Sequence, residues 1–295
     1  MPLYADRWIA LVIGNTRLHW GFFDCGYLKG VWHTPHLTGE MAHRLISHRL
    51  MAKSWQDIAE LTFDSAQSQL PEQPIAPSSI WMASVVSKQS KLWVLQSQAA
   101  VHIVLRSRIP LSGLYPTLGI DRAINLLGAG SAADWPVLVI DAGTALTLTA
   151  GVQTSGVDKA ARGSVYGGAI LPGLRLQRRA LASETSALSG ASDVDKIFSD
   201  GLRQQMLMPR RWANDTSGAI ASGISHSMVA TITDYLVDWW RRFPTGHVIL
   251  TGGDGPLLHT WLQKRTPEIA SRVQVDSCLM FRGMQVYRSA LILAS

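Results

Sequence analysis

Apolar and polar residues alternate in a pattern that predicts a strand-rich opening to the chain. Residues 8–13 form an apolar run, and over residues 18–22 apolar side chains alternate with polar residues or glycine, as in a half-buried strand. A third strand is expected over residues 27–33. Helices and short buried strands then alternate, with elements predicted over residues 38–51, 80–86, 87–98 and 101–105. We therefore expect a meander followed by alternating helices and strands.

A second strand-rich region follows a helix predicted over residues 119–133. A buried strand over residues 137–140 turns back through a glycine-containing turn into a strand that ends near Ala150. The remaining predictions are strands over residues 164–170, 247–250 and 273–275 and helices over residues 174–182, 194–208, 216–240 and 279–293. Because the turn at residues 14–16 also places a small residue beside a hydroxyl, the two hairpins indicate an internal duplication.

Two further stretches are expected at the surface. Residues 53–78 are polar, rich in glutamine and interrupted by proline, but a predicted strand follows at once. We therefore expect a surface excursion there and not a linker between domains. Residues 152–163 are polar and contain glycine, which favours an exposed loop.

The turn Asp141-Ala142-Gly143-Thr144 carries the first candidate chemistry. Gly143 allows a ligand to approach the backbone closely, and Thr144 adds a hydroxyl donor. Successive backbone N–H groups in such a turn form a concave anion site, and the Asp141 carboxylate can hold a cation. The same four residues also suit an ordinary hairpin turn. The turn alone therefore leaves both interpretations open.

Bulk composition narrows the class of protein. A chain of 295 residues with 47% hydrophobic and 16% charged residues is long enough and apolar enough for two packed domains. The net charge is +6, but the basic residues are scattered, which favours anionic small molecules and makes nucleic acid an unlikely partner. Cys25 and Cys278 are too few for a disulfide framework or a zinc site. With no visible signal peptide and no apolar segment long enough to cross a membrane, we expect a cytoplasmic protein.

Two further stretches carry candidate binding residues. Asp121 and Arg122 open a predicted helix, where a carboxylate beside a guanidinium can address an anionic substrate and its hydroxyl. Each also has a plainer explanation, because an acidic residue is favoured in a first helical turn and an arginine can serve in a surface salt bridge. Residues 251–255 place a glycine cluster between a strand and a helix, which favours close approach of a flat or anionic ligand.

In their order along the chain, these motifs resemble those of the type III pantothenate kinases, of the acetate and sugar kinase/Hsp70/actin superfamily. The resemblance covers nearly the whole chain. The matching segments are Gly14-Asn15-Thr16, Tyr115 with Gly119-Ile120-Asp121-Arg122, Asp141-Ala142-Gly143-Thr144, residues 167–173, Asn214-Asp215-Thr216 and Thr251-Gly252-Gly253. Any one of them is a weak signal, whereas six in the right order are not expected by coincidence.

The resemblance implies both a fold and a reaction. The fold would be α/β, a two-domain actin-like (ribonuclease H-like) ATPase fold with duplicated βββαβαβα cores. The domains would comprise residues 1–118 and residues 119–295, the second carrying a dimer interface. The reaction would be ATP-dependent phosphorylation of pantothenate to 4'-phosphopantothenate, the first step of coenzyme A biosynthesis.

The resemblance also implies a role for each matching residue. Asp121 would be the general base, and Asp141 would place a monovalent cation, K⁺ or NH₄⁺. ATP and its phosphates would be bound by Gly14, Asn15, Thr16, Arg17, Gly143, Thr144, Gly252 and Gly253. Pantothenate would be bound by Tyr115, Gly119, Ile120, Asp121, Arg122 and Thr216. Mg²⁺ or another divalent metal would accompany ATP, and the protein would be a homodimer in which Thr216 reaches the partner's pocket.

One residue departs from the family pattern. The family carries an aspartate two positions before the glycine of the first phosphate motif, where this chain has Val12. Valine cannot ligate magnesium. Two alternatives therefore stay open beside the pantothenate kinase: a catalytically weakened relative that acts as a binding or transcription-regulatory protein, and a kinase of another small alcohol.

Overall fold

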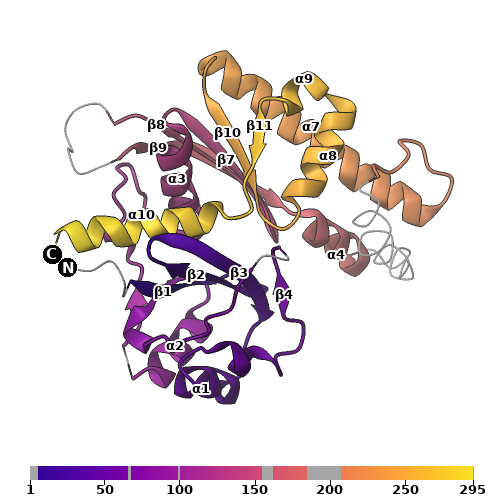
Figure 1. The fold of residues 1–295 in the computed structure, drawn as a ribbon. Helices are drawn as coiled ribbons and strands as arrows, with labels where there is room; N and C mark the ends of the chain where they lie inside the picture. The colour runs from indigo at the N-terminus through magenta and orange to yellow at the C-terminus, as the bar shows by residue number, and fades with distance from the viewer. Residues whose placement is uncertain (1–5, 66–67, 99, 155–161, 185–206, 295) are drawn as a thin grey trace. The chain divides into compact units, whose positions relative to one another are not determined.

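The computed structural model describes residues 6–65, 68–98, 100–154, 162–184 and 207–294 (Figure 1). The chain divides into two compact units. The first unit is Met1–Ser131, Gly156–Arg162 and Cys278–Ser295, and the second unit is Ala132–Ser155 and Gly163–Ser277. Within the described part of the chain, none of the helices has the length and apolar character that a membrane span requires.

A six-stranded sheet in the order β4-β3-β2-β1-β5-β6 forms the first unit. Its strands are β1 (Arg7–Ile13), β2 (Arg17–Asp24), β3 (Tyr27–Pro35), β4 (Thr62–Phe63), β5 (Ile80–Ser84) and β6 (His102–Ile103). β1 to β4 pair antiparallel, whereas β5 lies parallel to β1 and β6 parallel to β5. Its helices are α1 (Gly39–Ser47), α2 (Ser87–Gln96), α3 (Ile120–Ala133) and α10 (Leu279–Ala294), with short 3₁₀ helices η2 (Ala52–Trp55), η3 (Pro77–Ser79) and η4 (Arg106–Arg108).

The second unit contains a five-stranded sheet in the order β11-β10-β7-β8-β9. Its strands are β7 (Val137–Ala142), β8 (Ala145–Val152), β9 (Ser164–Pro172), β10 (His247–Thr251) and β11 (Val273–Val275). β7, β8 and β9 pair antiparallel, whereas β10 lies parallel to both β7 and β11. Its helices are α4 (Leu174–Glu184), α7 (Thr216–Arg242), α8 (Gly255–Arg265) and α9 (Pro267–Ala270).

The two sheets share one topology, which confirms the predicted duplication. In each unit three antiparallel strands lead into two parallel ones, and the first strand of the meander pairs with the first parallel strand. Apart from the two-residue strand β4, the helices α4 and α9 and the 3₁₀ helices, the chain order is β1-β2-β3-α1-β5-α2-β6-α3 and then β7-β8-β9-α7-β10-α8-β11-α10. This is the predicted βββαβαβα core repeated twice. The fold is the two-domain actin-like fold.

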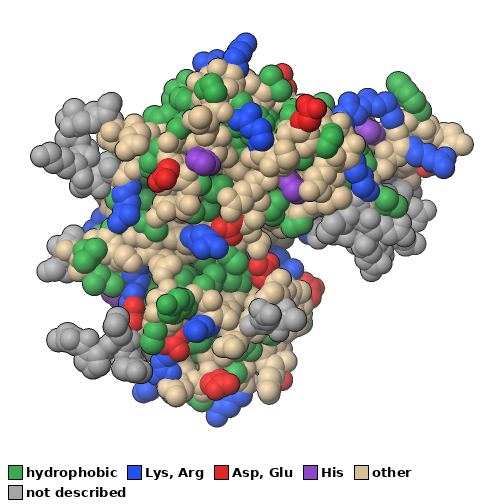
Figure 2. Space-filling view, turned by 45° about the horizontal axis from the view of Figure 1, so that its top comes forward, with side chains coloured by type: hydrophobic (Ala, Val, Ile, Leu, Met, Phe, Trp, Pro, Cys, Tyr) green, Lys and Arg blue, Asp and Glu red, His purple; other side chains and the backbone are tan. Residues whose placement is uncertain are grey.

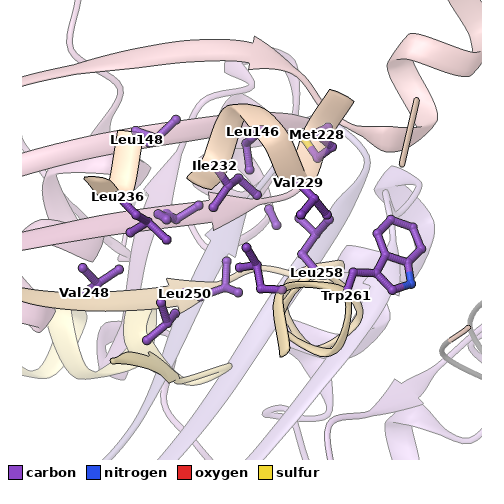
Figure 3. Packing of buried hydrophobic residues seen from close by; sticks show 14 of the residues in the cluster. Leu146, Leu148, Met228, Val229, Ile232, Leu236, Val248, Leu250, Leu258 and Trp261 are labelled. Atoms are coloured by element: carbon purple, nitrogen blue, oxygen red, sulfur yellow. The ribbon is translucent and has the colours of Figure 1, made fainter. Parts of the chain in front are cut away.

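Alternation along the strands explains the hydrophobic core of each unit. In the first unit four fully buried tryptophans share one cluster, with Trp20 edge-on to Trp55 and to Trp93. In the second unit α7 contributes a stripe that includes Ile232 and Leu236, which pack with strand and α8 residues (Figure 3). Burying such side chains contributes about 1.5–3 kcal/mol each. These cores fix the strand ends from which the candidate residues extend.

Some predicted elements differ from the structure. Residues 53–78 are not only a surface excursion, because Trp55, Ile58 and Ile75 join the core of the first unit. The predicted buried strand over residues 101–105 is reduced to the two-residue strand β6, which is exposed. The helix predicted over 194–208 lies outside the described residues except at its last two positions, which are not helical.

Close glycine contacts hold α3 against α10 within the first unit. A Cβ on Gly128 would meet the carbonyl oxygen of Leu279 at 2.6 Å, so only glycine allows the two helices to come this near. The hydroxyl of Tyr287 on α10 also accepts the backbone N–H of Leu105, at 3.1 Å. The contacts therefore group α3 and α10 with the N-terminal residues, whereas the predicted boundary lay between residues 118 and 119.

Candidate functional site

The first predicted phosphate turn joins β1 to β2. The backbone N–H of Gly14 donates to the carbonyl of Arg17 at 3.0 Å, which closes the hairpin. Asn15 and Thr16 at its tip are exposed. The guanidinium of Arg17 donates to the carbonyl of Glu60 at 2.6 Å, so its orientation is fixed by the segment before β4.

Val12 lies two residues before this turn, within β1. Its side chain is 2% exposed, and its backbone pairs with His19 on β2 and Ala83 on β5. The position at which the family pattern has an aspartate is thus filled by a packed apolar side chain. β1 offers no carboxylate ligand here.

Five of the predicted pantothenate-binding residues lie at or just before the start of α3: Tyr115, Gly119, Ile120, Asp121 and Arg122. A Cβ on Gly119 would overlap the Asp121 carboxylate, so a side chain at this position would displace that carboxylate from its place over the loop. One Asp121 oxygen, Oδ1, accepts the backbone N–H of Arg122 at 2.8 Å. The buried Arg122 guanidinium donates to the hydroxyl of Tyr115 at 3.1 Å, and Tyr115 itself is 40% exposed.

This arrangement goes beyond what a helix-start charge needs. A first-turn carboxylate is favoured by the helix dipole wherever it points. Here, the buried guanidinium of Arg122 lies within reach of the exposed phenol of Tyr115, and the preceding residue, Asp121, holds a half-buried carboxylate. Such a set can bind the charge and the hydroxyl of a small acid, as the sequence predicted. The roles of these residues stay predictions.

The second predicted phosphate turn joins β7 to β8 and packs against Gly173. The backbone N–H of Gly143 donates to the carbonyl of Ala145 at 3.0 Å. Gly173, at the end of β9, donates its N–H to the carbonyl of Thr144 at 3.1 Å, and a Cβ there would meet that oxygen at 2.6 Å. Thr144 is exposed and Asp141 is half-buried, so the turn presents its hydroxyl and carboxylate at the surface of the second unit.

The glycine cluster after β10 meets this turn. Gly252 has a φ of +87°, and a Cβ on it would lie 2.5 Å from both the carbonyl of Ala142 and Oδ1 of Asp141. The backbone N–H of Asp254 donates to the same Ala142 carbonyl at 2.9 Å. Gly253 is exposed. Two motifs that lie far apart in the sequence therefore form one surface at the ends of parallel strands β7 and β10, where α/β sheets commonly bind ligands.

The oxygen ligands at the second turn fit a metal ion that enters bound to ATP. They do not fit a metal site made of protein ligands alone. No cluster of three or more His, Cys, Asp or Glu residues able to hold a metal ion occurs among the described residues. Asp141 supplies one carboxylate beside the cradle formed by Gly252 and Gly143. Mg²⁺ keeps several waters and is commonly held by one or two carboxylates together with substrate phosphates. One carboxylate is therefore compatible with a nucleotide-bound cation.

Thr216 is the first residue of α7 and lies at an apolar groove. The N-cap of this helix is Asp215, whose Oδ1 accepts the N–H of Gly218 at 2.7 Å. A groove of about 440 Å³ separates α4 from α7. It is lined by Gln177, Leu181, Thr216, Ala219, Ile220, Gly223, Ile224 and Ser227.

Basic and acidic side chains are interspersed on the face shown in Figure 2 and form no continuous basic stripe there.

Three histidines beside the first turn, His19, His33 and His36, were not recognised from the sequence. The alternation in β2 placed His19 on the face opposite the core, but a polar residue on such a face is ordinary. Only the fold brings the three together.

Comparison with known proteins identifies the family. The family model for type III pantothenate kinase matches residues 8–238. A type III pantothenate kinase of a Nostoc species is 38% identical over 280 residues, covering 95% of this chain and 94% of that one. Another from a Synechococcus species is 39% identical over 284 residues, covering 96% and 93%. This chain belongs to the type III pantothenate kinase family.

Proposed function

We propose that this protein transfers the γ-phosphoryl group of ATP to the terminal hydroxyl of pantothenate, giving 4'-phosphopantothenate for coenzyme A biosynthesis. Family membership over nearly the whole chain carries this proposal. The grouping of Asp121, Arg122 and Tyr115 at the start of α3 supports it. The enzyme is a phosphotransferase with an alcohol group as acceptor.

Phosphoryl transfer needs an oriented nucleophile and neutralised phosphate charge, and little covalent work by the protein. In the proposed mechanism Asp121 accepts the proton of the pantothenate hydroxyl. Arg122 binds the pantothenate carboxylate as a charge-assisted donor, held in place by Tyr115. Gly119 leaves room for the Asp121 side chain, and Ile120 begins the helix that carries it.

The two hairpin turns are assigned to the phosphates. Backbone N–H groups of the turn from Gly14 to Arg17 and of the Gly143-Thr144 turn would donate to phosphate oxygens. Gly252 and Gly253 would face the adenosine side of the nucleotide, because their lack of side chains leaves the backbone open to a flat ring. Direct contact of these residues with ATP is part of the proposal.

Cations complete the proposed site. ATP enters with a divalent metal such as Mg²⁺, which neutralises phosphate charge. Asp141 would hold a monovalent cation, K⁺ or NH₄⁺, next to the phosphates through its carboxylate. Its half-buried position beside the Gly252 backbone supports this role, because few waters could solvate a cation there and the carboxylate would replace some of them.

We further propose a homodimer in which Thr216 completes the partner's pantothenate pocket. The groove between α4 and α7 has Thr216 at its edge, and Leu181 lines it while being 37% exposed. Leu176 on α4 is also 41% exposed. An apolar groove flanked by exposed leucines is suited to burial against a second copy of the chain.

A coupled assay of ADP release with pantothenate, with and without K⁺, tests the proposal. ADP release that requires pantothenate and increases with K⁺ is the expected result. Release with another small alcohol but not with pantothenate would favour the kinase of a different substrate. DNA binding without ADP release would favour the regulatory relative, for which the packed Val12 is the supporting feature.

A further inference from the structure

Three histidines lie beside the first phosphate turn in the first unit. His19 is on β2 and His33 is opposite it on β3, in the same cross-strand row as Val12. His36 follows β3 directly. Because paired residues of neighbouring strands point to the same face, Val12, His19 and His33 share one face of the sheet, opposite the tryptophan-rich core.

His36 holds the carbonyl group of the turn. Its Nε2 lies 2.8 Å from the carbonyl oxygen of Gly14. A carbonyl oxygen can only accept, so Nε2 carries the proton and donates it. The N–H of Gly14 is already bonded to Arg17. Both backbone polar groups of Gly14 are therefore engaged, one within the hairpin and one by a side chain from outside it.

His19 supports the same residue from the side. A Cβ on Gly14 would lie 3.5 Å from Nε2 of His19, which is ordinary packing distance. The other nitrogen, Nδ1, lies 2.9 Å from Nδ1 of His33, so one of these two nitrogens donates and the other accepts. The ring of His19 is thus fixed at one end by His33 and faces the turn with the other.

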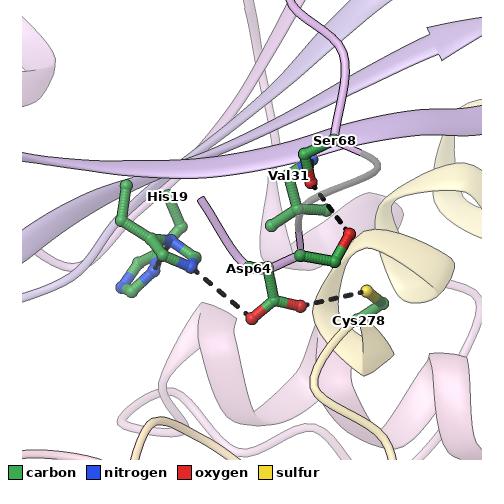
Figure 4. Close-up of polar contacts among 7 residues, drawn as sticks. His19, Val31, Asp64, Ser68 and Cys278 are labelled. Atoms are coloured by element: carbon green, nitrogen blue, oxygen red, sulfur yellow. Dashed lines mark hydrogen bonds and ion pairs between the residues drawn. The ribbon is translucent and has the colours of Figure 1, made fainter. Parts of the chain in front are cut away.

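A chain of polar contacts extends from this pair. Nε2 of His33 lies 3.9 Å from Oδ1 of Asp64, and Oδ2 of Asp64 accepts from the thiol of Cys278 at 3.7 Å. Figure 4 shows Asp64 between the imidazoles and Cys278. The pKa of His19 is lowered to about 4, chiefly by burial and then by the charges of His33 and Arg17, while Asp64 opposes the shift. His19 is therefore a neutral ring at physiological pH.

We propose that His36 and His19 are positioning residues for the first phosphate turn: they hold Gly14 in the conformation that presents the turn to ATP. This inference rests on the proposed function, because it takes the turn as a phosphate site. His36 acts through the Gly14 carbonyl and His19 acts by packing, so neither needs to touch ATP. Fixing the turn before binding removes an ordering cost from nucleotide affinity.

The test is direct binding of a non-hydrolysable ATP analogue with Mg²⁺, measured by calorimetry on the full chain. His36→Ala should weaken binding about 5- to 30-fold, since it removes one hydrogen bond that orders the turn. His36→Gln should bind within about 2-fold of the unsubstituted protein, because its amide N–H can replace Nε2–H. His19→Ala should weaken binding, and the KM for pantothenate should stay unchanged in every variant.

His48→Ala is the matched control. His48 also bonds a backbone carbonyl, that of Arg44, at 2.8 Å, but at the end of α1. It should lower the melting temperature about as much as His36→Ala without changing analogue binding. Equal analogue affinity in His36→Ala and the unsubstituted protein would overturn the inference, as would failure of His36→Gln to restore affinity.

The outcome separates this inference from the proposed function. If the protein binds the analogue, His36→Ala weakens that binding, and pantothenate is not phosphorylated, the proposed function alone is contradicted. If the unsubstituted protein phosphorylates pantothenate, and His36→Ala and His19→Ala bind the analogue normally, the inference alone is contradicted. Absence of analogue binding in the unsubstituted protein would overturn both.

Discussion

Asp121 is fixed by its immediate neighbours and not by a distant network. Its Oδ1 accepts the backbone N–H of Arg122, and Gly119 leaves the space into which the carboxylate folds. One carboxylate oxygen is thereby committed to the helix start. In the proposed mechanism the other, Oδ2, approaches the hydroxyl of the substrate.

Asp121→Asn tests this role with little change of shape. The amide oxygen can still accept the Arg122 N–H, but the side chain can no longer take a proton. We expect kcat to fall on the order of 10²- to 10⁴-fold while the Kd for an ATP analogue stays within about 2-fold. Steady-state kinetics and calorimetry measure the two effects, and a near-normal kcat would remove Asp121 as the base.

His19 should make stability depend on pH in a defined window. Its pKa of about 4 in the folded chain lies below the ordinary 6.5, so between these values the unfolded chain binds a proton that the folded chain does not. The free energy of unfolding should therefore fall as the pH drops from 6.5 to 4, by on the order of 2–3 kcal/mol.

Urea unfolding at a series of pH values, compared between the unsubstituted protein and His19→Gln, checks this slope. His19→Gln should flatten the acid side of the curve. The charged and titratable groups facing His19 are Arg17, His33 and Asp64. Equal acid slopes in the unsubstituted protein and His19→Gln would contradict the assigned burial of His19.

At the level of single residues, the sequence indicates which residues come together where local sequence determines geometry, while their roles stay predictions. Gly119 and Asp121 could be recognised because a helix start has a recurring pattern, and the structure shows them in contact. His36 could not be predicted as a partner of Gly14, because the contact depends on β3 returning beside the first turn.

The β7–β8 turn and the turn after β10 can lie against each other because glycine occupies the point of contact. Gly252 combines a positive φ with a close approach to Ala142 and Asp141. Any side chain at this position adds both backbone strain and a steric clash. The two contributions can be separated because the chain has a second glycine with a similar φ, Gly26 at +80°, where a Cβ would have no other atom within 4 Å.

Gly252→Ala should therefore be worse than Gly26→Ala. Both substitutions carry about 1–2 kcal/mol of left-handed backbone strain, but only Gly252→Ala also displaces the Asp141 turn. We expect Gly252→Ala to raise the KM for ATP several-fold and to weaken the dependence on K⁺, whereas Gly26→Ala should lower stability alone. Equal kinetics for the two variants would mean that the turn after β10 does not support the site.

Elements with a strong period could be predicted and irregular ones could not. The three strands of each meander and the long helix α7 follow from alternation and helical spacing. The prediction for residues 53–78 was incomplete, because this largely polar segment contains scattered apolar residues that reach the core, among them Trp55, Ile58 and Ile75. Isolated anchors of this kind have no period by which a sequence could reveal them.

Because the core is duplicated, each of the two units carries one glycine-bearing turn. The first unit carries the turn at residues 14–17 and the α3 residues, and the second carries the turn at residues 141–144 with Gly252. Both turns join the first two strands of a sheet with the same topology. The repeated core could be anticipated from the two hairpins, whereas the unit boundary could not, because it depends on the packing of α10 against α3.

The proposed shared pocket predicts complementation between two inactive variants. Asp121→Asn removes the base from its own pocket, and Thr216→Arg obstructs the pocket of the partner. In a mixed dimer one pocket carries both defects and the other carries neither. Unfolding and refolding the two variants together in equal amounts should restore about a quarter of normal activity, since half of the dimers are mixed and each has one intact pocket.

Each variant refolded alone is the control for this experiment. Size-exclusion chromatography should show a dimer for both variants and for the mixture. Activity in the mixture no greater than the average of the two separate variants would mean that Thr216 acts within its own subunit or not at all.

Mass spectrometry can detect 4'-phosphopantothenate after incubation of the protein with ATP, Mg²⁺, K⁺ and pantothenate, which tests the proposed reaction itself. We expect product with the unsubstituted protein and little or none with Asp121→Asn under the same conditions. Product formed equally by both proteins, or by neither although both bind the ATP analogue, would contradict it.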